Sequence, residues 1–100
     1  MRQTGSGNVG TATQAGNQSR ASITQNGTAN NATISQPLGG AYNDAFITQQ
    51  IGGNTATITQ TGLGTAAAHN TATINQNSAN NHATITQGGG SGNTATITQN

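Results

Sequence analysis

The heptapeptide NTATITQ stands at residues 54–60 and returns unchanged at residues 93–99. Close copies are NTATINQ at 70–76, NHATITQ at 81–87 and NNATISQ at 30–36. Within each copy, Asn, Ala, Ile and Gln occupy alternate positions, and Thr or Ser holds most positions between them. A period of two is typical of a β-strand, whose side chains alternate between the two faces of a sheet. Thr and Ile are β-branched and favour that conformation, so the heptapeptide predicts a strand.

The same pattern, written N-x-A-x-I-x-Q, fits eight segments of the chain, which we number in order. The frame begins at Asn8, Ser19, Asn30, Asn43, Asn54, Asn70, Asn81 and Asn93, and ends at Gln14, Gln25, Gln36, Gln49, Gln60, Gln76, Gln87 and Gln99. Segment 1 departs from the frame, with Gly10 and Ala12 where Ala and Ile are expected, and segment 2 begins with Ser19. So many copies in one chain predict a repeat architecture in which each copy packs against other copies.

The connections between segments are of two kinds. Those at residues 26–29, 50–53 and 77–80 are always four residues long, whereas the others vary from four to nine residues. A coil of two strands explains this alternation, because one edge carries a fixed turn and the other tolerates insertions. We therefore expect an all-β, cross-β amyloid-like β-solenoid of four coils, with two strands each, that form two facing parallel sheets. Residues 1–7 are expected to be a short N-terminal segment, and residues 8–100 a single repeat domain.

Three groups of residues are candidates for holding such a stack together. Inward amides at the strand ends are expected to form ladders of identical side chains, as in amyloid: Asn8, Asn30, Asn43, Asn54, Asn70, Asn81, Asn93, Gln14, Gln25, Gln36, Gln49, Gln60, Gln76, Gln87 and Gln99. The expected core consists of Ile23, Ile34, Ile47, Ile58, Ile74, Ile85, Ile97, Ala32, Ala45, Ala56, Ala72, Ala83 and Ala95. Arg20 and Asp44 hold the same outward position in segments 2 and 4, so we expect an exposed ion pair that marks the register.

Both ends of the predicted stack are expected to be uncapped, and the first coil is expected to begin at Asn8. Solenoids that stay monomeric need capping to cover such edges. The bare ends are therefore expected to join copies head to tail into a homopolymer. Ile97 of one copy would then stack on Ile23 of the next, and Ile85 would stack on Ala12.

The composition argues against several classes of function. Hydrophobic residues make up 29% of the chain and charged residues 3%, with a net charge of +1, so no basic surface is present to neutralise the phosphates of a nucleic acid. No apolar run is long enough to insert in a membrane, and MRQTGSG at 1–7 lacks the apolar region of a signal peptide. Asp44 is the only acid. With His69 and His82 read as ordinary polar residues, we expect no enzyme, metal or cofactor.

The frame resembles the curlin repeat of bacterial curli. The steps Gln25-Asn26-Gly27 and Gln60-Thr61-Gly62 match the Gln-x-Gly step of that family, and the resemblance covers residues 8–100. It implies a secreted, extracellular subunit of functional amyloid fibres at the cell surface, with a role in biofilm and adhesion. It also implies a surface-held nucleator homologue and a secretion channel as partners. Curli proper and another bacterial amyloid with Asn/Gln repeats remain alternatives.

Ice binding is a second hypothesis. Thr55, Thr57 and Thr59 are expected to point outward, and regular Thr arrays on flat β-solenoids resemble certain antifreeze proteins. An ice-binding face should be unbroken across a sheet, whereas Val9 and His82 interrupt this one. The fibre hypothesis is therefore favoured.

Overall fold

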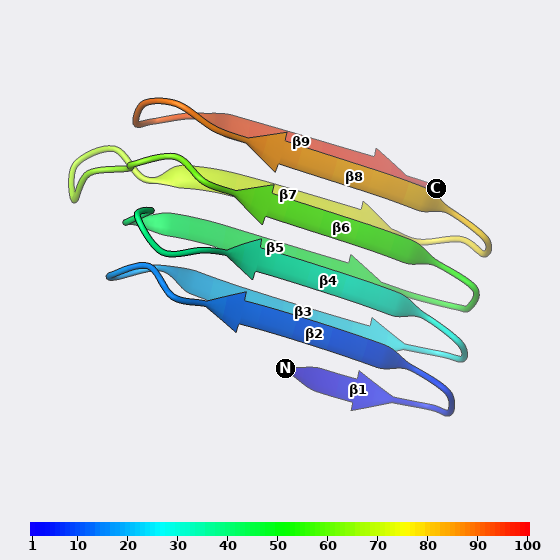
Figure 1. Cartoon of the computed structure of the whole chain (residues 1–100). Coiled ribbons are helices and arrows are strands. Elements are labelled where there is room, and N and C mark those ends of the chain that lie inside the picture. Colours follow the sequence, from blue (N-terminus) through cyan, green and yellow to red (C-terminus); the bar gives the residue numbers. More distant parts are fainter.

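The computed structural model describes residues 1–100 and contains nine strands and no helix. Figure 1 shows the strands stacked in two layers, with the arrows of the two layers pointing in opposite directions. The strands are β1 (Arg2–Thr4), β2 (Val9–Gln14), β3 (Arg20–Asn26), β4 (Asn31–Gln36), β5 (Asn43–Gln49), β6 (Thr55–Gln60), β7 (Asn70–Gln76), β8 (His82–Gln87) and β9 (Thr94–Gln99).

Odd-numbered strands form one sheet, in the order β1-β3-β5-β7-β9, and even-numbered strands form the other, in the order β2-β4-β6-β8. All pairs are parallel and in register, so each frame position lies beside the same position of the next coil, as in Ile34 with Ile58 and Ala45 with Ala72. The predicted all-β solenoid of two facing parallel sheets is confirmed. Each of the eight predicted segments forms one strand, from β2 to β9.

Strand β1 was not predicted, and the expectation that the stack begins uncapped at Asn8 is wrong for the odd-numbered sheet. Gln3 pairs with Gln25, and the flanking residues of β1 continue that register. Gln3 precedes Gln14 by the same 11 residues that separate Gln25 from Gln36. The segment therefore carries the end of a further frame, in which Gln3 is the only residue that matches the motif.

The core is one narrow column of Ala and Ile between the two sheets. Its buried members are Ile23, Ala32, Ile34, Ala45, Ile47, Ala56, Ile58, Ala72, Ile74, Ala83 and Ile85. Ala95 and Ile97 of β9 pack against this column but are only partly buried. Strand β9 has a neighbour on one side only, so the core is incomplete at the C-terminal end of the stack.

The fixed turns stack as regularly as the strands. Thr28 donates its backbone N–H to Ile51 O over 2.9 Å, and Gly53 donates to Thr28 O over 3.0 Å. Gly27 has φ +109°, and a Cβ at this position would overlap the carbonyl of Ile51 in the next coil. This glycine is required both by its left-handed backbone and by the close approach of successive turns.

Candidate functional site

The closing glutamines form two continuous ladders along the stack. In the odd-numbered sheet, each Nε2 donates to the Oε1 of the next coil at 2.6, 2.9, 2.8 and 2.9 Å, through Gln3, Gln25, Gln49, Gln76 and Gln99. In the even-numbered sheet, the distances are 2.8, 2.8 and 2.7 Å, through Gln14, Gln36, Gln60 and Gln87. The direction of donation is the same in every step, from the N-terminal coil to the C-terminal coil.

A second hydrogen bond determines this direction. The Nε2 of Gln25 also donates across the core to the backbone carbonyl of Val9, at 2.9 Å, and Gln49 donates in the same way to Asn31 O at 3.0 Å. A reversed amide would aim its oxygen at that carbonyl oxygen, and two acceptors cannot share a hydrogen bond. The ladders are therefore polar, and they also tie the two sheets to each other.

The asparagines do not form the amide-to-amide ladders expected from the sequence. Asn30 Oδ1 accepts instead from the backbone N–H of Asn54, at 3.1 Å, while Asn30 Nδ2 donates to Asn26 O in its own turn. The side chain of Asn is one methylene shorter than that of Gln, and here it bonds to the backbone at the strand start. Only Asn70 Nδ2, which donates to Asn43 Oδ1 at 3.0 Å, makes an amide-to-amide contact between frame asparagines.

These asparagine contacts also have one direction. Asn8, Asn30 and Asn54 accept in turn from the backbone N–H of Asn30, Asn54 and Asn81. In the other sheet, Asn93 N donates to Asn70 Oδ1 at 3.0 Å. Each frame asparagine that has a following coil thus presents its side-chain oxygen toward that coil.

Burial of the amides depends on their place in the stack. Gln25, Gln36, Gln49, Gln60, Gln76, Asn30, Asn43, Asn54 and Asn70 are fully buried, and every buried side-chain nitrogen and oxygen has a hydrogen-bond partner. Gln87 is 7% exposed, Asn8, Asn81, Asn93 and Gln99 are half-buried, and Gln14 is exposed. The amides nearest the two ends of the stack are thus accessible to another molecule.

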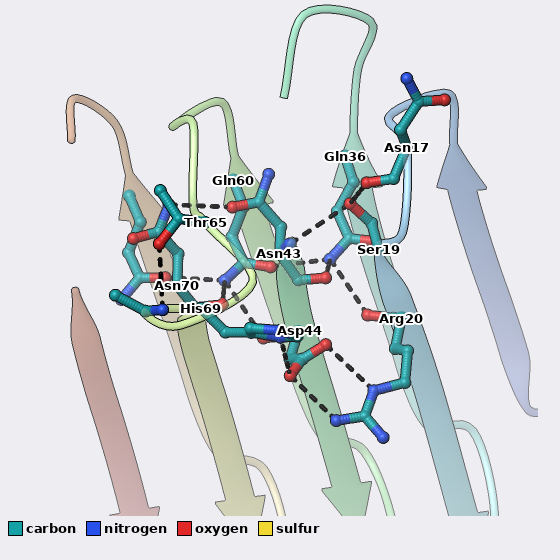
Figure 2. A network of polar contacts seen from close by, with 12 residues as sticks. Asn17, Ser19, Arg20, Gln36, Asn43, Asp44, Gln60, Thr65, His69 and Asn70 are labelled. Atoms are coloured by element: carbon teal, nitrogen blue, oxygen red, sulfur yellow. Dashed lines mark hydrogen bonds and ion pairs between the residues drawn. The ribbon is translucent and has the colours of Figure 1, made fainter. Parts of the chain in front are cut away.

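Arg20 and Asp44 are direct neighbours in the pairing of β3 with β5. Arg20 donates from Nε and Nη2 to the two carboxylate oxygens of Asp44 at 3.1 and 3.0 Å, as Figure 2 shows. The expectation that this pair is exposed is wrong for one partner, because the Asp44 side chain is only 7% exposed while that of Arg20 is 70% exposed.

The long connection between β6 and β7 covers Asp44. Its His69 places Nδ1 at 3.0 Å from Asp44 Oδ2 (Figure 2), and the ring of Tyr42 packs against His69 with centroids 5.4 Å apart. The hydrogen bonds from Arg20 hold the pKa of Asp44 below its ordinary value, with a further contribution from His69. No local sequence pattern indicates this contact, because an irregular loop brings His69 to Asp44.

His82 lies on the exposed face of β8. No group of three or more His, Cys, Asp or Glu side chains could hold a metal ion, and no pocket is present. No helix in the structure has the length and hydropathy needed to span a membrane. The candidate site is the stack itself, with its glutamine ladders and the strand edges at its two ends.

In-register parallel strands, buried polar ladders and open terminal edges define the class of protein: a β-solenoid built like a short piece of an amyloid protofilament. The family profile described as "Curlin associated repeat" matches residues 1–27, 19–50 and 69–100. These matches cover more than half of the chain, and the protein belongs to the curlin repeat family. No curated protein and no solved structure matches the chain. The family is structural rather than enzymatic, and its repeat is that of a curli-type subunit.

Proposed function

We propose that the protein is the structural subunit of an extracellular amyloid-like fibre, assembled head to tail by stacking of β-strands. The observation that carries this proposal is the polarity of the ladders. At the C-terminal end, Gln87 Nε2 donates only to Thr71 O. At the N-terminal end, Gln14 Oε1 accepts from no other coil, although Gln14 Nε2 donates to Gln36. A donor end and an acceptor end fit each other, and neither fits a second copy of itself.

The register of the even-numbered sheet defines the joint. Continued beyond β8, it sets His82–Gln87 of one copy beside Val9–Gln14 of the next, with Ile85 on Ala12. Gln87 Nε2 then donates to Gln14 Oε1, and Asn81 Oδ1 faces the backbone N–H of Asn8. The joint thus repeats the contacts seen between β2, β4, β6 and β8.

The same ladders are expected to make assembly cooperative. The buried core is one narrow column of Ala and Ile, so burial of apolar surface gives a lone copy little stability. A lone copy also leaves strand edges unpaired at both ends. We therefore expect a poorly ordered monomer that gains β structure with a lag.

The proposal is tested by following purified protein with an amyloid dye and by X-ray diffraction of the product. Fibres with a meridional spacing of ~4.8 Å and a spacing of ~10 Å between sheets are the expected result. A folded monomer that does not polymerise at high concentration would refute the proposed function.

The biological setting of the fibre is part of the same proposal. By membership of the curlin repeat family, we assign the fibre to the cell surface, with a role in adhesion and biofilm. A surface-held nucleator homologue and a secretion channel are the partners that this setting requires. Labelling of intact and permeabilised cells with an antibody to the fibre would test the location, since an extracellular fibre is labelled without permeabilisation.

Ice binding remains a second candidate because of one feature of the even-numbered sheet. Thr11, Thr33, Thr57 and Thr84 form an unbroken in-register column across β2, β4, β6 and β8. Thermal hysteresis of freshly prepared soluble protein would reveal such an activity. Its loss in Thr57→Lys, with fibre formation unchanged, would assign the activity to this column.

A further inference from the structure

We propose that β1 is a displaceable cap, which occupies the edge of β3 where strand β9 of a second copy docks during assembly. This inference rests on the proposed function and adds to it the step by which two copies join. It concerns the N-terminal end of the odd-numbered sheet, where β1 lies beside β3 (Figure 1) and Gln3 pairs with Gln25 in the register.

The positions of the strands along the axis of the stack, which we call their heights, lead to this inference. The even-numbered sheet has four strands, whereas the odd-numbered sheet has five because it contains both β1 and β9. The strands of the two sheets alternate in height, since Gln36 of β4 donates to Arg20 O of β3 and to Asn43 O of β5. When β2 of one copy stacks directly on β8 of another, β1 of the first copy falls at the height of β9 of the second. Only one of these two strands can occupy that height.

Strand β9 makes the better match to β3. Strand β1 pairs with β3 through Arg2, Gln3 and Thr4. Strand β9 carries the full frame and already pairs with β7 through six residues, Thr94–Gln99. In the same register on β3, it would set Ile97 on Ile23 and Ala95 on Ala21. The exchange doubles the number of paired residues and covers the half-buried end of the core.

The ladder can transfer from one strand to the other without loss of a bond. Gln25 Oε1 accepts from Gln3 Nε2 at 2.6 Å. At the other end of the chain, Gln99 Nε2 donates to His82 O but to no glutamine beyond it. In the exchanged arrangement, Gln99 Nε2 donates to Gln25 Oε1 as Gln76 donates to Gln99, so the polar ladder passes from one copy into the next.

The cap is also weakly held. All three residues of β1 are exposed, and Met1 is 65% exposed. A strand with so little buried surface opens easily. The closed cap lowers the apparent affinity of the β3 edge for a second copy, because that copy can bind only while the edge is uncovered.

A reversible lock tests the proposal. Arg2 and Thr24 are paired positions of β1 and β3, and the chain contains no cysteine, so Arg2→Cys with Thr24→Cys can be joined by a single disulfide. We expect the oxidised protein to lose growth on wild-type fibre seeds, at once at the end that exposes β8 and β9 and after one added copy at the end that exposes β2. Growth should recover when the disulfide is reduced. The matched control is Thr48→Cys with Asn75→Cys, which joins two strands that remain paired in the fibre and should leave growth unchanged.

A crosslink between copies identifies the strand that docks. A mixture of Thr24→Cys and Thr98→Cys proteins should form disulfide-linked dimers in fibres, whereas a mixture of Arg2→Cys and Thr98→Cys proteins should not. The opposite pattern, or equal growth of the locked and reduced proteins, would overturn the cap while leaving the fibre proposal intact. Failure of the wild-type protein to form any fibre would instead refute the proposed function.

Discussion

Gln49 Nε2 donates to Gln76 Oε1 over 2.8 Å, although these residues are 27 positions apart in the chain. Each is the last residue of its frame, and each is fully buried. The contact shows how the repeat produces the fold. A glutamine recurs at the same position of each coil, and its amide bonds to the equivalent glutamine of the next coil. Replacement of one rung therefore affects the two rungs beside it.

Gln49→Ala is expected to destabilise the fibre and slow its growth. The substitution leaves Gln25 Nε2 and Gln76 Oε1 each without one partner, and an unsatisfied buried polar group costs about 1–3 kcal/mol. Thr57→Ala, on the half-buried outward face of β6, is the matched control and should have a small effect. Equal shifts of the denaturant midpoint in the two variants would show that the ladder is not a determinant of stability.

Ile58→Ala is expected to cost about 2–5 kcal/mol, the range for a large-to-small change in a packed core. Ile58 is completely buried, and its neighbours Ile34 and Ile85 in the sheet are fixed by the register. The comparison is Ile58→Val, which removes one methyl group and should cost about 0.5–1.5 kcal/mol. Denaturant melting of fibres measures both, and similar losses would argue against a close-packed core.

Acid should weaken the fibre through Asp44. Its pKa is lowered in the folded chain by the hydrogen bonds from Arg20, so the stabilisation is present above the unfolded pKa, about 3.9. It is lost as pH falls through the lower folded pKa, because the carboxylate must then take up a proton. The denaturant midpoint of the wild-type fibre should fall across this acidic range. In Asp44→Asn, this part of the pH dependence should be absent, and an unchanged profile would assign it to other groups.

Gly27→Ala should disrupt the fixed turn. The new Cβ would overlap the carbonyl of Ile51, and φ at this residue is +109°. Gly90→Ala is the control, since nothing lies within 4 Å of a Cβ there and its φ is not positive. We expect the first variant to lengthen the lag of assembly and the second to assemble like the wild type. A normal lag in Gly27→Ala would mean that successive turns do not approach so closely.

The strands were predictable because the frame combines two regular signals. Alternation identifies a strand, and the recurrence of Gln at the same position gives the register, so that Gln25 and Gln49 were expected as neighbours. Strand β1 was missed because it retains only Gln3 of the frame. The burial of Asp44 was missed for a different reason. It depends on the path of an irregular nine-residue connection that ends at His69, and no periodicity describes such a path.

The bonding of the asparagines shows another limit of pattern reading. The sequence places Asn30 and Asn54 at equivalent positions, and the structure places them in neighbouring coils. Equivalent position does not determine which atoms bond. Because Asn30 Oδ1 reaches the backbone N–H of Asn54, the contact depends on the local geometry at the strand start rather than on residue identity alone.

The helical rise of the assembled fibre, measured by electron cryomicroscopy, tests the central claim most directly. Stacking of β2 on β8, with β9 in place of β1, requires a rise of four strand spacings per copy, or ~19 Å. A rise of five spacings, ~24 Å, would mean that β1 stays in place and that β8 and β2 do not pair. Fibres whose copies join side by side, without continuous ladders along the axis, would contradict the account as a whole.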